Sequence, residues 1–156
     1  MKQGLIEQLK TQESFFLNTI SVLSEEDSNF KPQAEMYSVA QQIAHAADTV
    51  SWFFDGVFTD KGYDMNFENY NEKMEKYTSL EESVKYFKDE FAKGISKLET
   101  IDDSELYAPI EGEIMTGAPK LAIVGAISDH TAHHRGSLAV YARLLGKVPK
   151  MPYGEM

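Results

Sequence analysis

The chain has 156 residues, a formal net charge of −10 and no cysteine. Such an acidic surface repels phosphate backbones and anionic membranes, and without cysteine the chain forms no disulfide, thiolate metal ligand or cysteine nucleophile. With 42% hydrophobic and 26% charged residues and no long apolar run or apolar leader, it is expected to be one soluble cytoplasmic domain spanning residues 1–156.

Apolar residues at helical spacing predict four long helices, over about residues 2–23, 38–57, 79–98 and 119–145. The second has the most regular pattern, because its apolar residues recur at intervals of four and three, as in a helix that buries one face. No segment has the alternating pattern of a strand. We therefore expect an all-α protein, a four-helix bundle.

Three of these helices carry start signals. Ser38 and Ser79 each precede a periodic segment, and Gln41 and Glu82 follow them at the spacing of a capping box. Proline is favoured in the first turn of a helix, so the fourth helix is expected to begin near Pro119.

The connections between the helices differ in length and character. Residues 58–78 are polar and rich in Tyr, Asn and Lys, and a short helix is expected within them around 71–77. Residues 102–117 are expected to form an acidic loop with a turn around Glu111–Gly112. The first of these connections has about twenty residues, enough to cross the bundle, so periodicity leaves the order of the helices open.

Three of the four histidines lie in the stretch Asp129–Gly136, inside the fourth predicted helix. His130 and His134 are four residues apart and share one helix face, a spacing from which two imidazoles can bind one metal ion. His133 points about 100° away and is expected at the surface or beside the ligands in a supporting role, rather than as a ligand itself. The alternative is a hydrogen-bonded pair of core histidines without a metal.

His45 lies in the 38–57 helix, to one side of its apolar seam, on a flank that it shares with Gln42, Thr49 and Trp52. Periodicity allows this flank to face either solvent or a cleft beside the fourth helix. If His45 joins the other two, three neutral imidazoles suit zinc, nickel or iron and leave a coordination position open, as catalytic sites do.

Four carboxylates are candidates for supporting roles. Asp48 and Asp129 could orient the imidazole rings, and Glu111 and Glu113 could act as a general base; the alternative for each is an ordinary exposed charge. A substrate pocket is expected between the second and fourth helices and the 102–117 loop. Its expected apolar walls are Trp52, Phe53, Met115 and Tyr141.

Several stretches of the chain resemble one known family. They are Tyr37–His45, Asp129–Gly136, Leu144–Gly146, Pro149 and Tyr153. Together with the helix pattern they resemble the DinB-like superfamily, which takes in the YfiT-type metal hydrolases, and the resemblance extends along the whole chain. Its most specific element is the sequence His-Thr-Ala-His-His-Arg-Gly within a final long helix.

This resemblance implies a four-helix bundle in up-down-down-up order, usually dimeric, with a divalent metal ion held by His45, His130 and His134. Zinc or nickel is expected before iron or manganese. Characterised members of the family include metal-dependent transferases of low-molecular-weight thiols and a thiol-dependent isomerase. One departure is Ser137, which stands where many relatives have Gln.

Two hypotheses about function follow from the resemblance and the histidine pattern. The first is a divalent-metal-dependent enzyme, either a hydrolase or a low-molecular-weight-thiol S-transferase, that acts on a small molecule, with its catalytic residues unassigned. The alternative is a non-catalytic, dimeric, stress-related helical module with a structural or incidental metal. Neither hypothesis involves nucleic acid or a membrane.

Overall fold

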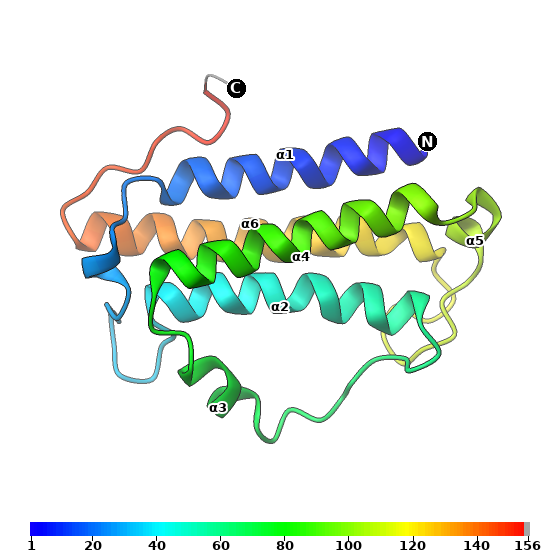
Figure 1. Cartoon of the computed structure of the whole chain (residues 1–156), viewed down its shortest axis with the longest axis horizontal. Coiled ribbons are helices and arrows are strands. Elements are labelled where there is room, and N and C mark those ends of the chain that lie inside the picture. Colours follow the sequence, from blue (N-terminus) through cyan, green and yellow to red (C-terminus); the bar gives the residue numbers. More distant parts are fainter. Residues whose placement is uncertain (155–156) are drawn as a thin grey trace.

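Four long helices lie along one another in the computed structural model, which describes residues 1–154 (Figure 1). They are α1 (Lys2–Ile20), α2 (Val39–Phe58), α4 (Leu80–Thr100) and α6 (Ile123–Leu144). The short elements are the 3-10 turns η1 (Glu25–Asp27) and η2 (Lys120–Ala122) and the helices α3 (Tyr70–Glu75) and α5 (Asp103–Tyr107). The described residues contain no strand, so the predicted all-α helical bundle is confirmed. None of the described helices is long and apolar enough to cross a membrane.

The core lies between the four long helices. α2 packs against both α4 and α6, and α1 packs against the same two helices. The large, fully buried apolar side chains include Phe16, Ile43, Phe87, Phe91, Ile127 and Leu138. Burial of each such side chain contributes roughly 1.5–3 kcal/mol to folding. All four helices therefore depend on one another, and the α2–α6 contact brings together the two histidine-bearing segments.

The predicted starts of α2 and α4 are both present. Ser38 accepts a hydrogen bond from the backbone of Gln41, whose side chain accepts one from the Ser38 backbone at 2.9 Å, which completes a capping box. At α4 the Ser79 side chain accepts from the backbone of Glu82 at 3.2 Å. The cap of α2 fixes the first turn of the helix and hence the direction of His45, two turns further on.

α6 begins later than the sequence predicts, at Ile123 rather than near Pro119. Pro119 has an extended backbone and forms an isolated bridge with Pro109, and the backbone of Lys120 donates to the carbonyl of Ala108. These bonds keep the chain out of helical geometry until η2. α5 was not predicted, because five residues are too few to show a helical period.

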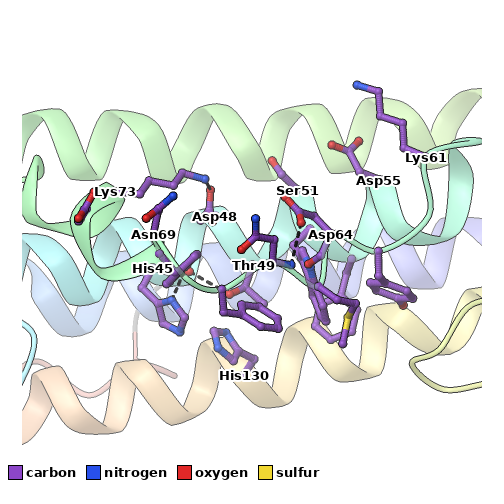
Figure 2. Close-up of a pocket in the computed structure, with 18 of the residues that line it drawn as sticks. His45, Asp48, Thr49, Ser51, Asp55, Lys61, Asp64, Asn69, Lys73 and His130 are labelled. Atoms are coloured by element: carbon purple, nitrogen blue, oxygen red, sulfur yellow. Dashed lines mark hydrogen bonds and ion pairs between the residues drawn. The ribbon is translucent and has the colours of Figure 1, made fainter.

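The connection between α2 and α4 carries α3 and bounds a cleft beside α2. The short helix expected around residues 71–77 is found at Tyr70–Glu75. The cleft has a volume of about 1240 Å³ and extends to His130 of α6 (Figure 2). The α2–α4 connection thus takes part in the site by forming one wall of this cleft.

Candidate metal centre

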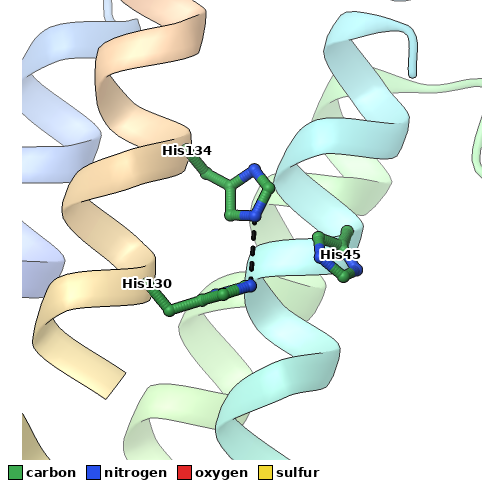
Figure 3. Close-up of side chains that lie close together, drawn as sticks. All are labelled: His45, His130 and His134. Carbon is green, nitrogen blue, oxygen red and sulfur yellow. Dashed lines mark hydrogen bonds between the residues drawn. The ribbon is translucent and has the colours of Figure 1, made fainter. Parts of the chain in front are cut away.

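His130 and His134 lie one helical turn apart on the same face of α6. Their Nε2 atoms are 3.1 Å apart, and His134 is buried while His130 is half-buried (Figure 3). Two nitrogens bound to one tetrahedral zinc ion at about 2.0–2.1 Å would be about 3.3 Å apart. The spacing of these two ring nitrogens therefore fits a shared ion.

His45 approaches the same point from α2. Its ring centroid lies 5.0 Å from that of His130 and 4.7 Å from that of His134. The nitrogens that the three residues can offer to an ion all lie within 4.8 Å of one another. In residues 1–154 no other cluster of His, Asp or Glu side chains meets this condition. The flank of α2 that periodicity left open thus faces the cleft and α6.

A chain of hydrogen bonds fixes the ring of His134. Its Nδ1 contacts the side-chain carbonyl of Gln42, whose amide group donates to the Tyr141 hydroxyl at 3.3 Å. The Tyr141 hydroxyl donates in turn to the backbone carbonyl of Tyr37 at 3.0 Å. Because a carbonyl oxygen only accepts, Nδ1 of His134 carries the proton and Nε2 keeps its lone pair for an ion.

Tyr70 of α3 has the corresponding position beside His45. Its hydroxyl oxygen lies 2.7 Å from Nδ1 of His45, and in the tautomer in which Nδ1 donates to this oxygen, Nε2 keeps its lone pair for an ion. Burial, together with the nearby Asp48 carboxylate, raises the pKa of Tyr70 well above its usual range, so the phenol stays neutral. A residue from the α2–α4 connection therefore helps to orient one of the three histidines.

The electrostatic environment keeps all three imidazoles neutral at pH 7. Burial, and to a smaller extent the neighbouring histidines, lower the pKa of His134 to about 3 and that of His130 to about 4. Burial also lowers the pKa of His45, although Asp48 opposes the shift. Neutral imidazole is the form that binds a metal ion, so the donor set fits a divalent cation.

The comparison with known families agrees with this geometry. A family model described as the DinB superfamily matches residues 8–138. The chain belongs to the DinB superfamily. No curated protein matches it. Membership in this superfamily and the histidine cluster together fit a metal-binding DinB-like protein with a divalent ion.

Ser137, the departure from the pattern of many DinB-like relatives, has no part in the histidine cluster. Its hydroxyl donates to the backbone carbonyl of His133 within α6, at 3.2 Å. The glutamine that orients a histidine in this DinB-superfamily member is Gln42 of α2. The sequence placed Gln42 only on the flank of His45, and its pairing with α6 could not be seen without the fold.

The acidic residues considered for supporting roles lie apart from the imidazoles. The carboxylate of Asp48 accepts hydrogen bonds from Lys73 and, at 2.8 Å, from Tyr86, and its charge raises the pKa of His45. Asp129 is exposed, as is His133, which was expected at the surface. The exposed side chains of Glu111 and Glu113 lie outside the cleft, so neither is placed to act there as a base.

The cleft next to the histidines is formed differently from the predicted pocket. Its lining comes mainly from α2 and residues 61–76, and Trp52 and Phe53 belong to it as expected. Tyr141 does not, because it is buried in the core, where its hydroxyl supports Gln42. Met115 and the 102–117 loop also lie outside the lining; this loop instead backs the ring of Tyr63, a cleft residue.

Proposed function

We propose that this member of the DinB superfamily is a divalent-metal-dependent enzyme that acts on a small molecule, as a hydrolase or as a transferase of a low-molecular-weight thiol. His45, His130 and His134 would hold the ion, with zinc or nickel preferred by three imidazole ligands over iron or manganese. The observation that carries the proposal is the convergence of three neutral imidazoles beside an open cleft.

The donor set favours a catalytic rather than a structural ion. Structural zinc sites are closed by four protein ligands, whereas catalytic sites have three and leave a position for substrate or water. Three residues make up the cluster found in the described part of the chain, and two of them, His45 and His130, line the cleft. A substrate in the cleft would therefore reach the open side of the site.

Residues of the chain preorganise the site for a ligand. Gln42 and Tyr70 fix the rings of His134 and His45, so little reorganisation is needed when a ligand arrives. Burial keeps the imidazoles unprotonated. A bound divalent ion would supply polarisation of a substrate oxygen or sulfur.

We further propose that the chain forms a homodimer and that its helices run in up-down-down-up order. Val140 and Leu144 support the dimer, because they lie one turn apart on α6 and are 54% and 60% exposed. The connection that carries α3 supports the helix order, because it is long enough to cross the bundle and so lets α2 and α4 run in the same direction. Light scattering tests the dimer: the wild-type protein should have the mass of a dimer and Leu144→Lys that of a monomer. A monomeric wild-type protein would exclude the dimer.

Metal analysis tests the proposed function. The purified protein should hold about one divalent ion per chain, and His45→Ala or His134→Ala should abolish its retention. His133→Ala is the matched control, because this exposed neighbour on α6 lies outside the cluster. Unchanged metal content in both cluster variants would exclude the site.

Chelation then separates the enzyme from the alternative, a structural metal in a non-catalytic module. If the ion is catalytic, stripping it should abolish activity in thiol-transfer or amide-hydrolysis assays and leave the helical circular-dichroism signal largely unchanged. A structural ion would couple to unfolding, so loss of helicity on chelation would support the alternative.

A further inference from the structure

One face of α2 lines the cleft from the histidines outward. His45, Thr49 and Trp52 are spaced by four and three residues, so they share this face, and all three line the cleft. At 1.5 Å per residue, Trp52 lies about 10 Å along the helix from His45. Figure 2 shows the labelled His45, Thr49 and Asp64 following one another along the cleft. The cleft thus has two ends, one at the histidines and one at Trp52.

The end of the cleft at Trp52 is aromatic. The Trp52 ring lies 4.6 Å from Tyr63 and 6.4 Å from Phe67, measured between ring centroids. Phe67 and Met65 also line the cleft, although they are 54% and 41% exposed. These two side chains lie outside the hydrophobic core, so packing of the bundle does not explain their apolar character.

The indole of Trp52 is fixed by the protein itself. Its Nε1, the only hydrogen-bond donor of the side chain, donates to the backbone carbonyl of Asp64 at 2.8 Å. What Trp52 can still offer to a ligand is therefore its aromatic surface. Aromatic groups stack on such a surface in offset or edge-to-face arrangements.

The charges that line the cleft nearly cancel. They come from four carboxylates and three ammonium groups, namely Asp48, Asp55, Asp64, Glu72, Lys61, Lys73 and Lys76. One ammonium group, that of Lys73, is already paired with Asp48. In a chain with a net charge of −10, this lining offers no surplus of positive charge for a phosphorylated ligand.

We infer that the cleft takes an elongated, uncharged substrate with a planar aromatic group, which stacks on Trp52 about 10 Å from the atom directed at the histidines. This inference rests on the proposed function, because the histidine end of the substrate is the end that an ion would bind. It adds the substrate class, which the histidine cluster alone leaves open.

A series of hydroxamic acids tests the distance between the two ends. Hydroxamates bind divalent ions, so acetohydroxamate probes the histidine end alone, while phenylalkyl hydroxamates add a ring on a linker of increasing length. With the zinc-loaded protein, we expect the dissociation constant to fall about ten- to a hundredfold once the linker spans about 10 Å. The chain has a single tryptophan, so only these longer probes should also change its fluorescence.

Two variants show whether the gain comes from Trp52. Trp52→Leu keeps an apolar side chain and removes the ring, so by calorimetry the preference for the long linker should disappear while acetohydroxamate affinity and zinc content stay unchanged. Phe15→Leu is the control, because it removes a ring of α1 that lies outside the cleft. The long-linker preference should survive in this variant.

The possible failures are distinguishable. If acetohydroxamate binds but all linker lengths bind equally, the aromatic end is wrong and the metal proposal stands. If the length preference persists in Trp52→Leu, the ring binds elsewhere and the inference is overturned. If the protein holds no zinc and no hydroxamate binds, the proposed function fails and the inference fails with it.

Discussion

Gln42 and His134 are 92 residues apart in the chain, yet their side chains form a hydrogen bond between α2 and α6. The Gln42 amide also donates to Tyr141, so both ends of the carboxamide are engaged and its orientation is defined. This single side chain decides which nitrogen of His134 faces the other histidines. The geometry of the candidate metal centre therefore depends on a neutral amide that is not itself a candidate ligand.

The first prediction concerns this amide. Gln42→Leu keeps the approximate volume and removes the acceptor, so His134 loses its orienting partner, and metal affinity should fall about 10- to 100-fold. Competition with a chromophoric chelator measures the affinity. Ser137→Ala is the matched control, because within residues 1–154 the Ser137 hydroxyl bonds to its own helix alone, and it should bind metal like the wild type. Equal affinity in Gln42→Leu would show that His134 is held by its packing alone.

The second prediction concerns the phenol beside His45. Tyr70→Phe removes the hydroxyl 2.7 Å from Nδ1 of His45 and keeps the ring, so metal affinity should fall about tenfold with little change in helicity. Tyr77→Phe, in the same connection, is the control and should leave the affinity unchanged. A wild-type affinity in Tyr70→Phe would mean that α3 bounds the cleft without supporting the site.

The predictable and unpredictable parts of this site differ in the range of the interactions that create them. The capping box of Ser38 and Gln41 and the shared face of His130 and His134 follow from local spacing, and the structure has both. Whether His45 faces solvent or α6 depends on packing between helices, which spacing along one helix does not encode. The family resemblance identified His45 as a candidate metal ligand, and the fold brings it beside His130 and His134.

The residues that orient the histidines are even harder to predict from local spacing in the sequence. Tyr70 reaches His45 from a six-residue helix in a polar connection, where no hydrophobic period marks which side chains point inward. Tyr141 has the spacing of a core residue and is one, but its hydroxyl acts through Gln42 on His134. Such a role for a buried hydroxyl becomes visible only when its partners are known.

The third prediction is a loss of stability in mildly acidic solution for the metal-free protein. Burial and the neighbouring histidines lower the pKa of His134 to about 3 and that of His130 to about 4, whereas the unfolded chain takes up these protons near pH 6.5. The stability linked to these groups is therefore present above pH 6.5 and falls progressively as the pH decreases towards the folded-state values. Between about pH 6.5 and 5, histidine is the main side chain that titrates.

Thermal unfolding of the chelated protein at several pH values measures this slope. His134→Gln removes one buried titrating group and should flatten the dependence of the melting temperature on pH. His133→Gln, which replaces the exposed neighbour, should leave the slope close to that of the wild type. A wild-type melting temperature that is constant from pH 7 to pH 5 would contradict the burial of neutral imidazoles.

The fourth prediction concerns the close approach of α4 to α2, the helix that carries His45. A Cβ atom at Gly94 would lie 2.6 Å from the ring of Phe54. Alanine in a helix is intrinsically favoured over glycine by about 1 kcal/mol, but overpacking a core typically costs about 1–3 kcal/mol. Both partners are buried and the ring has little room to move, so Gly94→Ala should lower the unfolding free energy in urea.

Gly125→Ala is the matched comparison for this change. It is also a glycine within a long helix, α6, but a Cβ there would meet nothing within 4 Å. Only the intrinsic helix preference then acts, and the substitution should raise the unfolding free energy by up to about 1 kcal/mol. The opposite signs of the two effects isolate the contact with Phe54, because the chemical change is the same. If Gly94→Ala were stabilising as well, α4 and α2 would be farther apart at this contact than the structure has them.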